Sequence, residues 1–85
     1  MMQAEVVKNG TVSSTHEIDV AMPIRDEGSL LLQLHGESRK LSAVAADFED
    51  ADEIRIDDGR TFAGYGDVIV AYRMDPNTVQ VRIRE

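Results

Sequence analysis

The sequence predicts an α+β domain: a curved, mostly antiparallel β-sheet, either barrel-like or a small sandwich, with one short helix. Three observations predict this class. Apolar and polar residues alternate with period two along most of the chain. Turn-forming dipeptides separate the alternating runs. One segment alone, around residues 39–49, has the period of a helix. With 85 residues the chain forms a single domain, 1–85.

Two dipeptides predict tight hairpin turns. Asn9-Gly10 lies between the runs "QAEVVK" and "TVSSTH", and both of its positions tolerate the positive φ of a type I′ turn. Asp58-Gly59 lies in the same way between "EIRID" and "RTFAG". The Pro-containing "MDPN" near residue 76 predicts another turn before the final strand.

The middle of the N-terminal half predicts two further strands. In "HEIDVAMPI" the alternation places Ile18, Val20 and Met22 on one apolar face. Pro23 cannot donate to a β-ladder, so this strand ends there or lies at a sheet edge. After the turn "RDEGS", the run "LLLQLH" predicts a strand buried mostly on one side, with its inward residues being Leu30, Leu32 and Leu34.

The period changes in "SRKLSAVAADFED". Its apolar residues fall at i, i+3, i+4 and i+7, which is one stripe of a helix: Leu41, Val44, Ala45 and Phe48. Ser38 is the expected N-cap. Basic residues lie at the start of the predicted helix and acidic residues crowd its end, both against the helix dipole. A helix this short must be held by packing its stripe on the sheet.

The C-terminal strands alternate clearly. In "EIRID" the isoleucines face inward while Glu53, Arg55 and Asp57 face outward. The run "DVIVAYR" predicts a second strand. The last run, "TVQVRIRE", is the clearest half-buried strand, with inward residues Val79, Val81 and Ile83.

Composition limits the class of protein. The chain has no cysteine, so neither a disulfide nor a thiolate zinc site stabilises it. No apolar run is long enough to span a membrane, and the N-terminus lacks the pattern of a signal peptide. We therefore expect a soluble protein that lies in the cytoplasm of a host cell or in a virion.

The formal net charge of −7 is concentrated in one segment. Residues 47–58 carry seven acids and one arginine, or −6. Such a chain repels nucleic acid and anionic membranes and attracts a basic partner. An EF-hand is excluded, because neither register of the segment puts glycine at loop position six. The alternatives are a solvated surface and an interaction surface formed by Asp47, Glu49, Asp50, Asp52, Glu53, Asp57 and Asp58.

Catalysis is poorly supported by the sequence. His16 and His35 have no partner at catalytic spacing and are expected to be exposed strand residues. "GYG" at 64–66 lacks the spacing of a phosphate loop, so its glycines are expected to permit a bulge or bend. Tyr65 fits core packing better than an exposed contact, but it remains a candidate partner-binding residue. We predict no enzyme, no cofactor, no metal and no direct nucleic-acid binding.

The C-terminal half, from "LSAVAADFED" through "DDGRTFAGYGDVIVAYR" to the last strand, resembles small uncharacterised proteins encoded by phages and prophages of Gram-positive bacteria. The resemblance implies a phage or mobile-element origin. It carries no catalytic motif and transfers no residue role.

The resulting hypothesis is a non-enzymatic, acidic protein-binding module that engages a basic surface of another protein through residues 47–58. One form is an inhibitor of host defence that imitates nucleic acid, as anti-CRISPR proteins do. The alternative is a structural subunit of a phage tail or head, a homo-oligomer whose function lies in strand edges and contacts between copies. A third possibility is an enzyme or a calcium-binding domain whose ligands come from different strands.

Overall fold

A computed structural model describes residues 2–37, 40–71 and 76–84, without the side chains of residues 26 and 69–71. The strands are β1 (Met2–Lys8), β2 (Thr11–Ile18), β3 (Val20–Asp26), β4 (Ser29–His35), β5 (Glu53–Ile56), β6 (Thr61–Ala63), β7 (Tyr65–Ala71) and β8 (Thr78–Arg84), and the helix η1 spans Leu41–Phe48.

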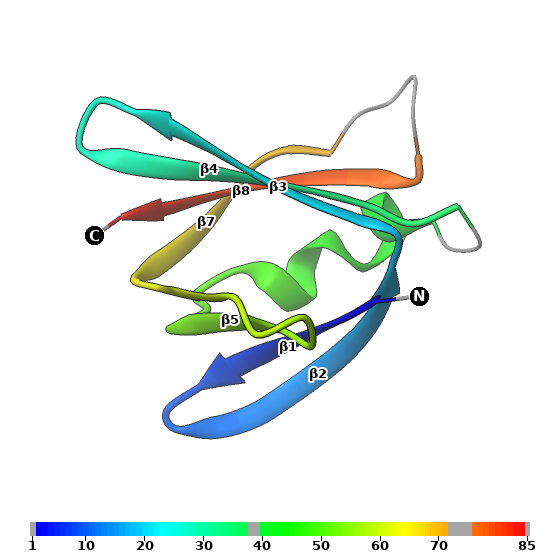
Figure 1. Ribbon diagram of the computed structural model, residues 1–85, viewed down its shortest axis with the longest axis horizontal. Helices are drawn as coiled ribbons and strands as arrows, with labels where there is room; N and C mark the ends of the chain where they lie inside the picture. The colour runs from blue at the N-terminus through cyan, green and yellow to red at the C-terminus, as the bar shows by residue number, and fades with distance from the viewer. Residues whose placement is uncertain (1, 38–39, 72–75, 85) are drawn as a thin grey trace.

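The strands form two antiparallel sheets, which confirms the predicted fold class in its sandwich form. Sheet A has the order β2-β1-β5-β6, and sheet B has the order β3-β4-β8-β7. Figure 1 shows the two sheets above and below η1, with β2 leading into β3 at one side of the molecule.

A single core lies between the sheets and the helix. The alternation predicted most of it: the inward residues of β4, β5 and β8 are all buried. Each sheet contributes residues to the same apolar cluster, and η1 contributes Leu41 and Phe48. The two sheets are therefore joined by packing as well as by the chain.

The prediction for the face of β3 is wrong. Ile18 is buried as expected, but Val20 and Met22 are 44% and 51% exposed, and Ala21 is buried instead. The reason is that the chain leaves sheet A and enters sheet B at Asp19, whose backbone N–H donates to the carbonyl of His35 at 2.7 Å. This bend shifts the alternation by one residue, which reverses the faces. Pro23 does lie in an edge strand, as predicted.

Both predicted hairpin turns are confirmed. Asn9 and Gly10 have φ of 54° and 77°, and they connect β1 to β2. Gly59 has φ of 101° in the turn from β5 to β6. Strand β8 lies between β4 and β7, so it is not an edge strand of sheet B. Its Arg84 pairs with Asp67 of β7 at 3.2 Å.

The helix has the predicted inward stripe but is a 3₁₀ helix. Leu41 and Phe48 are fully buried, and Val44 and Ala45 pack against the core. Bonds from the Ala43 N–H to Lys40 and from the Glu49 N–H to Ala46 have the i to i+3 spacing of a 3₁₀ helix. Ser38 lies outside the described residues; Lys40 occupies the N-cap position, and no side chain caps the helix.

Candidate functional site

The acidic segment is divided between a loop, a strand and a turn. Asp47 lies in the last turn of η1, and Glu49, Asp50 and Asp52 lie in the loop that leads to β5. Glu53 begins β5, while Asp57 and Asp58 lie in the turn that follows it. The strand separates Glu53 from Asp57 by four residues, or about 13 Å. The carboxylates therefore do not form one compact cluster.

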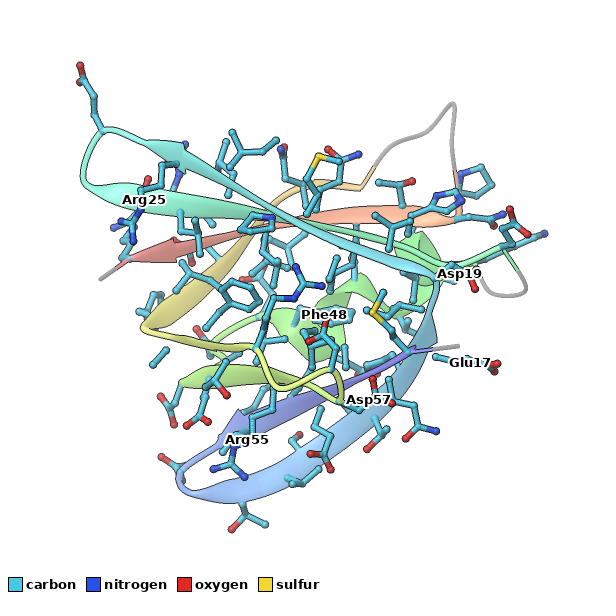
Figure 2. All side chains as sticks on the ribbon, viewed as in Figure 1. Glu17, Asp19, Arg25, Phe48, Arg55 and Asp57 are labelled. Carbon is cyan, nitrogen blue, oxygen red and sulfur yellow. The ribbon has the colours of Figure 1, made fainter. Side chains whose placement is uncertain are left out.

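Pairing of β1 with its neighbours brings two further acids to the side of β5. Glu5 lies opposite Arg55 on one flank and Thr15 on the other. Gln3 lies opposite Glu17, and its carbonyl accepts a bond from the Asp57 N–H at 3.1 Å. We call the outward residues Glu5, Glu17, Glu53 and Asp57 the acidic face. Figure 2 shows Glu17, Arg55 and Asp57 along the sheet that contains β1 and β5.

Sequence reasoning missed Glu5 and Glu17. Their outward positions follow from the alternation in β1 and β2, but only the pairing of β1 with β5 places them beside the acidic segment. With Arg55 included, the acidic face carries a net charge of −3. The four carboxylates lie on three paired strands and the start of a turn, so sheet A holds their spacing.

Two arginines neutralise part of the segment. The Arg55 guanidinium bonds to Glu53, and this contact raises the pKa of Arg55 above its ordinary value. Arg60 bonds to Asp58 at 2.8 Å, and its hydrogen bonds hold the pKa of that carboxyl below its usual range. Arg60 also donates to the carbonyl of Ala21 at 2.8 Å. The Asp58–Arg60 pair therefore connects sheet A to β3.

The loop before β5 is fixed at both of its central acids. The Asp52 carboxylate accepts a bond from the Asn9 N–H at 2.6 Å, at the β1–β2 turn. The Asp50 carboxylate accepts a bond from the Tyr65 hydroxyl, which raises the pKa of Tyr65. Tyr65 is 49% exposed, so the preference for core packing is wrong, and its ring is available as a contact aromatic.

Asp47 contacts a histidine that the sequence placed on the surface. His16 is only 2% exposed, and its ring packs on Phe48 with centroids 4.7 Å apart. Its Nε2 lies 3.0 Å from the Ser14 hydroxyl oxygen and 3.5 Å from the Asp47 carboxylate. In a catalytic triad the acid and the serine contact opposite ring nitrogens. Here both contact the same one, so the arrangement fits a structural contact.

The remaining two candidates are Glu49, which is half-buried, and Asp57, which is exposed. Within residues 2–37, 40–71 and 76–84, the side chains of Glu49 and Asp57 make no ion pair or hydrogen bond. His35 is half-buried and bonds through Nδ1 to the Thr78 hydroxyl oxygen at 2.9 Å.

The described residues contain no group of three or more His, Cys, Asp or Glu side chains that could hold a metal ion. No helix among them has the length and apolar content needed to cross a bilayer. In comparisons with known proteins, no family model, curated protein or solved structure matches this chain.

Proposed function

We propose that this chain is a non-enzymatic protein-binding module whose acidic face contacts a lysine- or arginine-rich surface of a partner protein. The observation that carries the proposal is the acidic face itself: four outward carboxylates around one arginine on a paired sheet. A preformed charged surface steers a basic partner and fixes its orientation. Glu49 and Asp50 lie in the loop before β5, and the Tyr65 hydroxyl on β7 bonds to Asp50; these three residues are further partner-binding candidates.

The more specific form of the proposal is an inhibitor of phage or mobile-element origin that occupies a nucleic-acid-binding surface of host machinery. Its support is the charge of residues 47–58 together with the resemblance of the C-terminal half to phage-encoded proteins. Such an inhibitor competes with nucleic acid for its partner, and its binding weakens as salt rises.

The test compares two triple variants with the same change in charge. Glu5→Gln, Glu17→Gln and Asp57→Asn remove charge from the acidic face and keep the Glu53–Arg55 pair. Glu27→Gln, Glu37→Gln and Asp67→Asn remove charge elsewhere. The probe is a fluorescently labelled decalysine peptide, and the affinity is measured by anisotropy at low and high salt.

The acidic-face variant should bind the probe roughly threefold to a hundredfold more weakly, since each surface charge contributes about 0.2–1 kcal/mol. The control variant should change affinity less than about twofold. Equal weakening by both variants would mean that net charge alone attracts the probe, and the proposed surface would be lost. Circular dichroism spectra of both variants verify that the fold is intact.

The structural-subunit alternative is favoured by a different observation. The outward residues of β3 are apolar and exposed: Val20, Met22 and Ile24 are 44%, 51% and 42% exposed. Light scattering tests this alternative. A closed oligomer that persists in high salt and dissociates on Met22→Glu supports a structural subunit, whereas a monomer at all concentrations removes it.

A further inference from the structure

A groove of about 360 Å³ lies where the free edges of the two sheets meet. One side is β3, the edge of sheet B, and the other is β6, the edge of sheet A. Its lining residues come from these strands and from β4: Pro23, Arg25, Leu30, Thr61, Phe62 and Ala63. The groove lies apart from the acidic face, whose residues are on β1, β2 and β5 or directly after β5.

The two edges differ in what their backbones offer. On β3, the Ala21 carbonyl already accepts a bond from Arg60, and Pro23 has no N–H. On β6, the ladder begins with the Ile56 N–H donating to the Arg60 carbonyl. Because hydrogen-bonded and non-hydrogen-bonded pairs alternate, Thr61 and Ala63 direct their N–H and C=O groups away from β5. Strand β6 is therefore the edge that can accept another strand.

The side chains of the groove combine an apolar floor with a cationic rim. Leu30 is 7% exposed, and the half-buried Phe62 packs against the core from the other sheet. Arg25 lies directly opposite Leu30 in the register of β3 and β4, so its guanidinium borders the floor. Figure 2 shows Arg25 near the end of the β3–β4 hairpin. A positive rim next to an apolar floor is complementary to an acidic residue beside an apolar one.

We propose that β6 binds an extended, acidic segment of a partner protein, which adds to sheet A as a fifth strand. The segment places an apolar side chain over Leu30 and Phe62, and a carboxylate two residues away beside Arg25. Alternate residues of a strand share a face, which fixes this spacing. The main-chain bonds to Thr61 and Ala63 give affinity, and the two side chains give specificity. This site takes acidic peptide and is independent of the proposed basic partner of the acidic face.

The test is an NMR titration of ¹⁵N-labelled protein with the peptide acetyl-STLTD-amide, whose leucine and aspartate are two residues apart. Acetyl-STLTK-amide is the charge-reversed control peptide. Arg25→Glu reverses the rim, and Lys8→Glu, at the end of β1, is a control with the same change in charge. Slower amide hydrogen exchange at Thr61 and Ala63 shows that the peptide has paired with β6, and this measurement needs no mutation.

The acidic peptide should give saturable shifts at residues 61–63 and slow exchange at Thr61 and Ala63. Arg25→Glu should weaken its binding roughly threefold to tenfold and make the lysine peptide the better ligand, while Lys8→Glu binds as the original chain does. Absence of saturable shifts in the groove would overturn the proposal. The proposal would also be overturned if the acidic peptide and the lysine peptide bound equally well, both to the original chain and to Arg25→Glu. Groove shifts that depend on protein concentration alone would assign the groove to a second copy and overturn the proposed occupant.

Discussion

Among the glycines that the structure describes, Gly64 leaves the least room for a side chain; the chain passes there from β6 to β7 and so from sheet A to sheet B. Its φ is 145°, a conformation that residues with a side chain rarely adopt. A Cβ at this position would lie 2.4 Å from the Arg84 carbonyl oxygen and 2.8 Å from Cγ2 of Ile83. Gly64→Ala is therefore expected to be severely destabilising.

Two costs add at this position. Backbone strain at an unfavourable φ costs about 1–3 kcal/mol, and overpacking against the carbonyl of a central strand costs about 1–3 kcal/mol. The lower entropy of the unfolded alanine chain offsets about 0.4–1 kcal/mol. The net loss is about 1–6 kcal/mol, out of a total that scaling by length puts at roughly 4–13 kcal/mol.

Urea denaturation followed by circular dichroism measures this loss. Gly10→Ala is the matched control, because Gly10 has φ of 77° and no atom within 4 Å of a built Cβ. Gly66→Ala measures the cost of overpacking alone. A Cβ at Gly66 would lie 3.3 Å from atoms of Ala51 and Phe48, and Gly66 does not have a positive φ. A Gly64→Ala protein no less stable than Gly10→Ala would refute the reasoning that close approach adds to the cost of backbone strain at Gly64.

Three other predictions concern the core and two hydrogen-bonded acids. Phe48→Ala should cost about 3–5 kcal/mol in urea denaturation, because it removes a fully buried ring between the helix and the sheets. In a Tyr72→Phe background, absorbance titration should give Tyr65 a pKa above its ordinary value, and Asp50→Asn should lower it again; an unchanged pKa would exclude the bond. The pKa of Asp58 is lowered on folding, so its contribution to stability is present above the unfolded pKa of about 3.9 and is lost as pH falls through the folded value. Melting temperatures of Asp58→Asn and the original chain should therefore differ at neutral pH and converge in acid.

Local pattern predicted most of the fold. Period-two runs identified the strands, and Asn9-Gly10 identified a hairpin because positive φ at both positions is a local requirement. The stripe ending at Phe48 identified the helix, whose ends the structure places at Leu41 and Phe48. In each case the deciding interactions lie within a few residues of one another in the chain.

The errors arise where the chain changes sheets. The alternation in "HEIDVAMPI" is regular, yet the bend at Asp19 reverses it and exposes Val20 and Met22. A bend at one residue does not change the pattern of apolar and polar residues, so the sequence pattern does not reveal it. His16 was misplaced for a different reason: it lies two residues before Ile18 on the same inward face of β2, a local signal that the expectation of an exposed histidine overlooked.

The candidate surface could be predicted in part. Asp57 and Glu53 follow from the alternation in β5, and the Glu53–Arg55 contact is local to that strand. The arrival of Glu5 from β1 depends on strand order. Strand order depends on contacts between distant parts of the chain, and local sequence patterns do not reveal it. The acidic face therefore differs from the segment 47–58, because it includes two acids from β1 and β2. Asp58 is not part of it, and its charge is neutralised by the ion pair with Arg60.

The central claim, that the acidic face is the docking surface for a basic partner, is tested most directly by mapping where a basic probe binds. The measurement is the change in amide chemical shifts of ¹⁵N-labelled protein titrated with decalysine. The account predicts that the largest shifts fall on β1, β2 and β5 around Glu5, Glu17 and Asp57, and that they diminish at high salt. Shifts of equal size over both sheets, or shifts concentrated on sheet B, would contradict it.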